Sequence, residues 1–266
     1  MRRRGAYFWG SVLILLGLIL LAQNMGWIRD AGGLIWPALL ILAGAWILWG
    51  ALGRRPGADV EQVVIPLEGA RRARLRVRHG AGRLIIAGGA PANTLLSGSF
   101  AGGLDYRSRP EGDVLDVKLR GSEHGWYGPW AFPARGGFDW NFALNSDIEL
   151  ALDLRIGANG ADLNLTDLRV TELNLEMGAS STQLTLPAHA GFTRANLRLG
   201  AAALSLRAPA GVAVRLRVRA GLASINVDTA RFPRQAGDTY QSPDYDTAAN
   251  KIDIDVEAGL GSLDLR

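Results

Sequence analysis

The residues best placed to do chemistry in this chain are short glycine turns flanked by charged side chains. Six turns share the pattern, and their glycines are Gly80, Gly157, Gly178, Gly200, Gly221 and Gly259. Glycine-rich turns cradle phosphate where a helix N-terminus follows, because free backbone amides and the helix dipole then meet the anion. A stretch of alternating apolar and polar residues, typical of a β-strand, follows every glycine here. The pattern therefore favours a structural role over a phosphate or nucleotide site.

Two arginine-rich stretches, 71–83 and 215–219, are a second candidate for chemistry. Strand alternation places three arginines of each stretch on one face: Arg74, Arg76 and Arg78, and Arg215, Arg217 and Arg219. A positive stripe near a membrane anchor would contact anionic lipid headgroups. The favoured alternative is a solvated outer face whose arginines pair with acidic neighbours such as Asp153, Glu172 and Asp255. No recognition helix or aromatic-basic motif accompanies the arginines, so we expect no nucleic-acid partner.

The remaining chemistry-bearing residues do not form a catalytic or metal-binding pattern. The three histidines, His79, His124 and His189, lie far apart and lack zinc-ligand spacing. The chain has no cysteine and neither a GxSxG nor an HExxH motif. Its acidic residues alternate with aliphatic ones, as on a solvent-exposed strand face, and 238–246 approaches a calcium loop without matching the EF-hand pattern. We therefore expect no enzyme activity, no cofactor and no metal site.

The elements that position the glycines form a repeat. The third residue before each glycine is aliphatic: Val77, Leu154, Leu175, Leu197, Val218 and Val256. The second residue before it is charged: Arg78, Arg155, Glu176, Arg198, Arg219 and Glu257. The central four glycines are spaced 21, 22 and 21 residues apart, a period typical of solenoids whose coils stack.

Stacking of these coils makes specific predictions about neighbouring residues. Leu154, Leu175, Leu197 and Val218 should form one aliphatic column, and Glu176 should lie between Arg155 and Arg198 in the outer row. Each glycine is explained either by a positive φ or by a corner too crowded for a side chain.

Two apolar runs, 6–22 and 33–52, contain no charged residue, and each is about long enough to cross a bilayer core as a helix. The short connection between them predicts a two-helix transmembrane hairpin over 1–53. Basic residues flank its outer ends: Arg2, Arg3, Arg4, Arg54 and Arg55. By the positive-inside rule these arginines set the topology and place both termini in the cytoplasm. The alternative is a cleaved signal peptide over 1–22, but its end lacks a small-x-small cleavage pattern.

After a linker at 54–65, the pattern predicts a β-solenoid domain over 66–266, with irregular loops at 121–137 and 228–250. The first loop opens an aromatic cluster whose candidate contact residues are Trp126, Tyr127, Trp130, Phe132 and Trp140. These aromatic side chains would cap an open coil, contact a partner or the membrane, or bind a ligand.

The first apolar region, with its basic start, FWG, N-x-GW turn and WP before the second span, resembles the LiaI/LiaF-like transmembrane region of bacterial envelope-stress proteins. The closing segment NKIDIDVEAGLGSLDLR resembles the last repeat of toast-rack, adhesin-like β domains. The resemblance implies a mainly β, single-stranded right-handed β-solenoid after a transmembrane hairpin. It also implies a non-enzymatic role, since LiaF-like proteins inhibit a membrane sensor kinase in cell-wall antibiotic responses.

These observations together predict a multi-pass protein of the bacterial cytoplasmic membrane that works by contact. The expected partners are membrane lipid and either a sensor kinase or a second copy of the chain. A regulator of envelope-stress signalling is the first interpretation. A self-assembling membrane-attached scaffold and an adhesin-like extracytoplasmic domain are the alternatives.

Overall fold

The computed structural model describes residues 60–121 and 138–266, and within these two ranges the regular structure consists of β-strands. The expected transmembrane hairpin at 1–53 and the first half of the linker, residues 54–59, lie outside the described residues. So does nearly all of the loop at 121–137. In the described ranges no helix is long and apolar enough to span a bilayer.

Thirteen strands follow one another in the part of the chain that the structure describes. They are β1 (Val60–Pro66), β2 (Arg72–Gly88), β3 (Thr94–Ala101), β4 (Leu104–Glu111), β5 (Val114–Gly121), β6 (Trp140–Leu144), β7 (Glu149–Asn164), β8 (Arg169–Met177), β9 (Ser181–Thr185), β10 (Phe192–Arg207), β11 (Ala213–Val227), β12 (Thr239–Gln241) and β13 (Lys251–Leu265). The expected alternation of apolar and polar residues is visible in their burial, as in β10, where every second residue from Thr193 to Leu199 is buried. Period-two burial is the reason these sequences form strands with one covered face.

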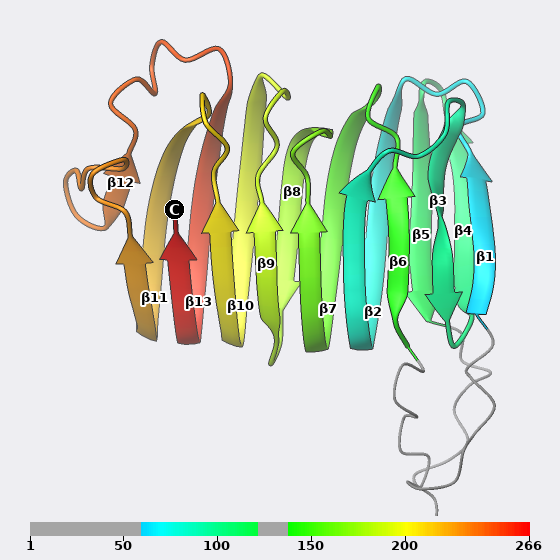
Figure 1. The fold of residues 1–266 in the computed structure, drawn as a ribbon, viewed down its shortest axis with the longest axis horizontal. Coiled ribbons are helices and arrows are strands. Elements are labelled where there is room, and N and C mark those ends of the chain that lie inside the picture. The colour runs from blue at the N-terminus through cyan, green and yellow to red at the C-terminus, as the bar shows by residue number, and fades with distance from the viewer. Residues whose placement is uncertain (1–59, 122–137) are drawn as a thin grey trace, which may run out of the picture. The chain divides into compact units, whose positions relative to one another are not determined.

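The long strands β2, β7, β10, β11 and β13 each cross from one layer of the domain to the other. Their first halves form a layer in the order β4, β5, β2, β7, β8, β10, β13, β11, β12, and their second halves form another in the order β1, β3, β6, β2, β7, β9, β10, β13, β11. Figure 1 shows the two layers, with the first halves behind and the second halves in front. We call these the rear and front layers.

The core lies between the layers and contains the expected aliphatic column. In the rear layer it runs through Val77, Leu154, Leu175, Leu197, Val256 and Val218, all at most 7% exposed. The prediction that Leu154, Leu175 and Leu197 are neighbours is therefore confirmed. The prediction was wrong in placing Val218 directly after Leu197, because Val256 of β13 lies between them.

The order of the coils is thus not the order of the sequence. The last coil, β13, is inserted in parallel between β10 and β11 and contacts both along its whole length. Antiparallel strands flank the parallel stack at its two ends, namely β1, β3 and β4 at one and β12 at the other. A regular succession of coils therefore describes only the centre of the domain.

Two boundaries also differ from the prediction. Residues 60–65, expected in the linker, belong to β1, because Val63 and Ile65 alternate into the core while β1 pairs with β3. The irregular loop 228–250 contains the short strand β12 and two buried aromatics, Phe232 and Tyr245. This loop covers the rear-layer edge of β11 at the C-terminal end of the solenoid.

Candidate functional site

The edge at which the strands turn from the rear to the front layer is lined by the repeated glycines, and we call it the glycine corner. The glycines stack in the order Gly80, Gly157, Gly178, Gly200, Gly259, Gly221. A Cβ atom on Gly178 would lie 3.1 Å from the carbonyl oxygen of Gly157, and one on Gly259 would lie 2.9 Å from that of Gly200. None of these six glycines has a positive φ. Crowding by the neighbouring backbone therefore explains the glycines from Gly157 onward.

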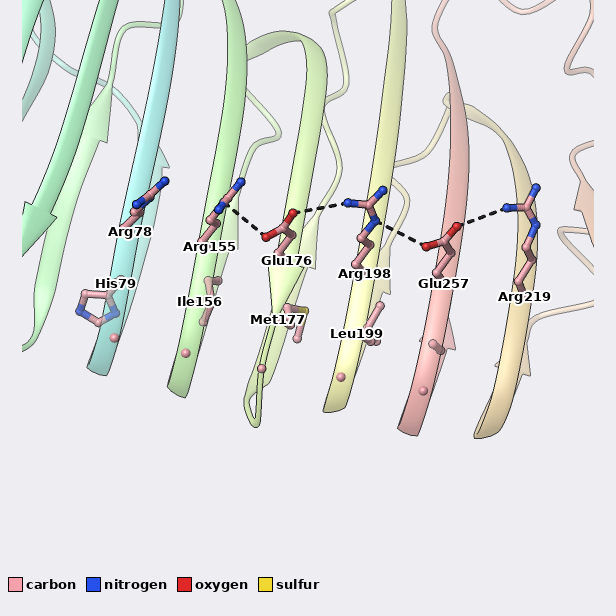
Figure 2. Close-up of a pocket in the computed structure, with 16 residues that line it drawn as sticks. Arg78, His79, Arg155, Ile156, Glu176, Met177, Arg198, Leu199, Arg219 and Glu257 are labelled. Atoms are coloured by element: carbon pink, nitrogen blue, oxygen red, sulfur yellow. Dashed lines mark hydrogen bonds and ion pairs between the residues drawn. The ribbon is translucent and has the colours of Figure 1, made fainter.

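A row of charged side chains runs along the rear side of the glycine corner (Figure 2). Glu176 is 3.3 Å from Arg155 and 3.5 Å from Arg198, which confirms its predicted place between them. Glu257 then lies 3.5 Å from Arg198 and 3.2 Å from Arg219. We call this alternating row the charge ladder. Its side chains are 42–84% exposed, so each pair contributes at most about 1 kcal/mol.

The charge ladder and the corner together line a shallow groove of about 1010 Å³. Its apolar part comes from the residues just before the glycines, among them Ile156, Met177 and Leu199, which are at most 4% exposed. A long open groove of this kind suits an extended surface contact better than an enclosed small molecule, which is held in a concave, largely covered pocket. In residues 60–121 and 138–266, no group of three or more metal-ligating side chains is arranged to hold an ion.

His79 is the one buried histidine among the described residues, and it sits at the β2 end of this groove. Its Nε2 donates to the carbonyl oxygen of Phe138 at 2.7 Å, and its Nδ1 accepts from the amide of Asn159. The ring centroid lies 4.9 Å from that of Trp140. Burial lowers the pKa of His79, so the neutral ring is favoured. His79 therefore binds the backbone of Phe138, the first described residue after the aromatic loop, to β2 of the solenoid.

The aromatic contact residues expected from the sequence divide into two groups. Trp126, Tyr127, Trp130 and Phe132 lie outside the described residues, as do the topology-setting arginines. Trp140 was expected to be a contact residue, but its side chain is 2% exposed. Its ring packs edge-on against that of Phe100, with the ring centroids 5.3 Å apart. Its side chain points inward from β6 with Phe142, in the alternation of a half-buried strand. Trp140 is therefore part of the core and not a contact residue on the surface.

The arginine stripe on β11 is neutralised by the neighbouring coil. Arg217 binds Asp255 through two hydrogen bonds of 2.7 and 3.1 Å and also lies 3.3 Å from Asp253. The hydrogen bond and charge of Arg217 lower the pKa of Asp255, and the same pairing raises that of Arg217. On β2, Arg76 pairs with Asp116 at 2.6 Å. For these arginines the ion-paired outer face, rather than a free positive stripe, is the correct interpretation.

A two-layer β-solenoid with a buried aliphatic column and a polar, ion-paired surface defines the class of protein. Residues 55–207 match the N-terminal domain of toast_rack, DUF2154, and residues 7–48 match the LiaI-LiaF-like transmembrane region. The chain therefore belongs to the toast-rack family, and its domains are those of a membrane-associated, LiaF-type protein. Neither matching family is a known enzyme family.

One solved structure agrees with the fold. A candidate cell adhesion protein from Clostridium sporogenes superposes with a TM-score of 0.70 at 19% identity, covering 78% of this chain and 98% of its own. A candidate adhesin from Bacteroides fragilis matches with a TM-score of 0.29 at 9% identity, covering 80% of this chain and 100% of its own. No curated protein sequence matches this chain. At 19% identity the first similarity establishes the fold alone.

Proposed function

We propose that this protein is a non-enzymatic, membrane-anchored regulator of envelope-stress signalling that acts, as LiaF-like proteins do, on a membrane sensor kinase. The observation that carries the proposal is the union in one chain of a LiaI-LiaF-like transmembrane region at 7–48 with a toast-rack domain at 55–207. The long, ion-paired groove of the glycine corner supports a role in surface contact.

The proposed topology is a two-helix hairpin in the bacterial cytoplasmic membrane with both termini in the cytoplasm. It is supported by the arginines before and after the two apolar runs and by the even number of runs. Two reporters fused after Arg266 test it, one active only in the cytoplasm and one active only outside the membrane. Activity of the outer reporter alone would refute the proposed topology and favour the adhesin-like alternative.

The regulatory function is tested by deletion of the gene and measurement of envelope-stress transcription with and without a cell-wall antibiotic. An inhibitor of a sensor kinase predicts higher basal transcription in the deletion strain, because the kinase is released. Expression of the full chain should restore the basal level. Unchanged transcription in both conditions would contradict the proposal.

A self-assembling scaffold is a second candidate function, and one edge of the solenoid supports it. The front-layer half of β11, residues 222–227, pairs only with β13 on one side and contains no charged residue or proline. The other edges of the described domain are protected. β4 contains Arg107, Arg109 and Pro110, β12 is three residues long, and β1 contains Glu61 and ends at Pro66.

An unprotected strand edge is a template for strand addition by a second copy. Because the chain lacks cysteine, Ser224→Cys on this edge allows a clean test by disulfide cross-linking of the full chain in membranes. Ser205→Cys is the control, since Ser205 is exposed on β10 in the interior of the same layer. A scaffold predicts cross-linked dimers for Ser224→Cys and not for Ser205→Cys, and equal results for both would contradict edge-to-edge assembly.

A further inference from the structure

Two leucines are exposed side by side on the front side of the glycine corner. Leu222 is 84% exposed and Leu260 is 53% exposed, and they are register partners on β11 and β13. Leu222 has the highest exposure of any large hydrophobic residue in residues 60–121 and 138–266. Exposed apolar side chains that adjoin one another are candidates for an interaction site, whereas scattered single ones need no explanation. We call Leu222 and Leu260 the leucine pair.

The chain enters the solenoid along the same edge. One row of register partners crosses the front layer just past the corner, and it runs through Glu61, Phe100, Trp140, Leu84, Ala161, Thr182, Leu204, Leu263 and Ile225. Val60, the first described residue, precedes Glu61 and is 57% exposed. Val60 and the leucine pair therefore lie at the two ends of one edge, separated by eight strand spacings or about 40 Å.

Little chain separates Val60 from the membrane. The LiaI-LiaF-like transmembrane region ends at residue 48, so only residues 49–59 connect it to β1. Even fully extended, this connection spans at most about 40 Å. Val60 is therefore tethered to the transmembrane region, and contact of this edge with the bilayer lies within reach of the chain.

The charges along the edge suit an anionic surface. The charge ladder and Arg78, which continues it on β2, contain four arginines and two glutamates, so the row keeps a net charge of +2 although the ladder is ion-paired. Arg219, at 84% exposure, flanks the leucine pair on its rear side. Basic residues beside exposed leucines form the usual combination of surfaces that bind an anionic lipid interface, because charge attracts the headgroups and apolar side chains insert below them.

We propose that the glycine corner lies along the surface of the bilayer, tethered at Val60 and held at the opposite end by the leucine pair in the headgroup region. The solenoid then rests on the membrane through one edge, and its two layers stand away from the bilayer. This inference uses the membrane attachment of the chain and does not depend on regulation of a kinase.

The cysteine-free sequence allows a direct test with single spin labels on the full chain in nanodiscs that contain phosphatidylglycerol. Labels are placed at Leu222→Cys and Leu260→Cys, with Ser205→Cys as the control on the front layer. Collision rates are measured with oxygen, which partitions into the bilayer, and with a water-soluble nickel chelate. Thermal unfolding of each labelled variant confirms that the domain is folded, as expected for substitutions at such exposed positions.

We expect the labels at 222 and 260 to collide with the nickel chelate several-fold less often than the label at 205, while their collisions with oxygen increase. Equal access of the nickel chelate to all three labels would overturn the proposal. Exclusion of both reagents from 222 and 260 would also overturn it, since that result means coverage by protein. Replacement of phosphatidylglycerol by a neutral lipid should reduce the difference between the labels.

Discussion

Glu257 lies between Arg198 and Arg219, 3.5 Å from one guanidinium and 3.2 Å from the other. It occupies this place because β13, the last strand of the chain, inserts between β10 and β11. In the order of the sequence, Arg198 and Arg219 would be adjacent like charges, which destabilise neighbouring strands. The coil order and the charge pattern are therefore consistent with each other.

Replacement of Glu257 by arginine should lower the stability of the domain, because it disrupts the charge ladder. Glu257→Arg places three arginines in consecutive coils, removes two ion pairs and adds two repulsions. We expect a loss of about 1–2 kcal/mol in the free energy of unfolding at low salt, measured by urea denaturation of the full chain in detergent. Glu257→Gln should cost less, because it removes the pairs without adding repulsion. A cost that does not shrink in 1 M salt, where the Debye length falls to about 3 Å, would contradict the electrostatic explanation.

Two glycine-to-alanine substitutions should differ strongly in their effect on the stability of the domain. Gly259→Ala brings a Cβ atom to 2.9 Å from the carbonyl oxygen of Gly200, so the stacked backbones must separate. We expect a loss of about 1–3 kcal/mol, the usual cost of overpacking. Gly160→Ala on β7 is the matched control, since it has open space and no positive φ. Circular dichroism melting curves should show a clear drop for Gly259→Ala, and an equal drop for both would argue against crowding.

Because of His79, the stability of the domain should decrease at mildly acidic pH. Burial lowers the pKa of His79 in the folded state below its ordinary value of 6.5. As the pH falls through 6.5, the unfolded chain therefore takes up a proton that folded His79 does not, and the free energy of unfolding decreases. This decrease continues until the pH reaches the folded pKa.

The carboxylates with lowered pKa, Asp113, Asp255 and Asp264, start from ordinary values of 3.8 and act at lower pH. Urea denaturation between pH 8 and 5 should therefore isolate the histidine effect. His79→Gln should flatten the profile in this range relative to the native chain. An unchanged slope in the variant would assign the pH dependence to other groups.

Much of the fold was predictable because it depends on local patterns. Alternation predicted the strands, the recurring glycine predicted the corner, and the residue types beside it predicted the contacts of Glu176 with Arg155 and Arg198. The insertion of β13 was not predicted, since the order of coils depends on pairings between segments distant in the chain. One signal was present in the charges, because Glu257 is the outer-row glutamate left to separate Arg198 from Arg219 once Glu176 lies between Arg155 and Arg198.

The candidate contact residues were harder to predict than the strands. Composition alone indicates one aromatic cluster, although alternation within 140–144 places Trp140 and Phe142 in the core. The exposure of Leu222 and Leu260 was not predicted from the sequence. Both are aliphatic residues directly after a glycine, and only the register of the folded strands shows that they share the outer side of the corner.

The burial of Trp140 leads to the last prediction. Its ring fills the space between Phe100 and His79, with centroids at 5.3 and 4.9 Å, and β6 pairs with β2 and β3 around it. Trp140→Ala should therefore cost about 3–5 kcal/mol, as expected for loss of a fully buried aromatic side chain. Trp140→Phe should cost less, because most of the packing remains. If Trp140 were instead a contact residue on the surface, neither substitution should change the free energy of unfolding. Urea denaturation of the two variants therefore decides between a core and a surface role.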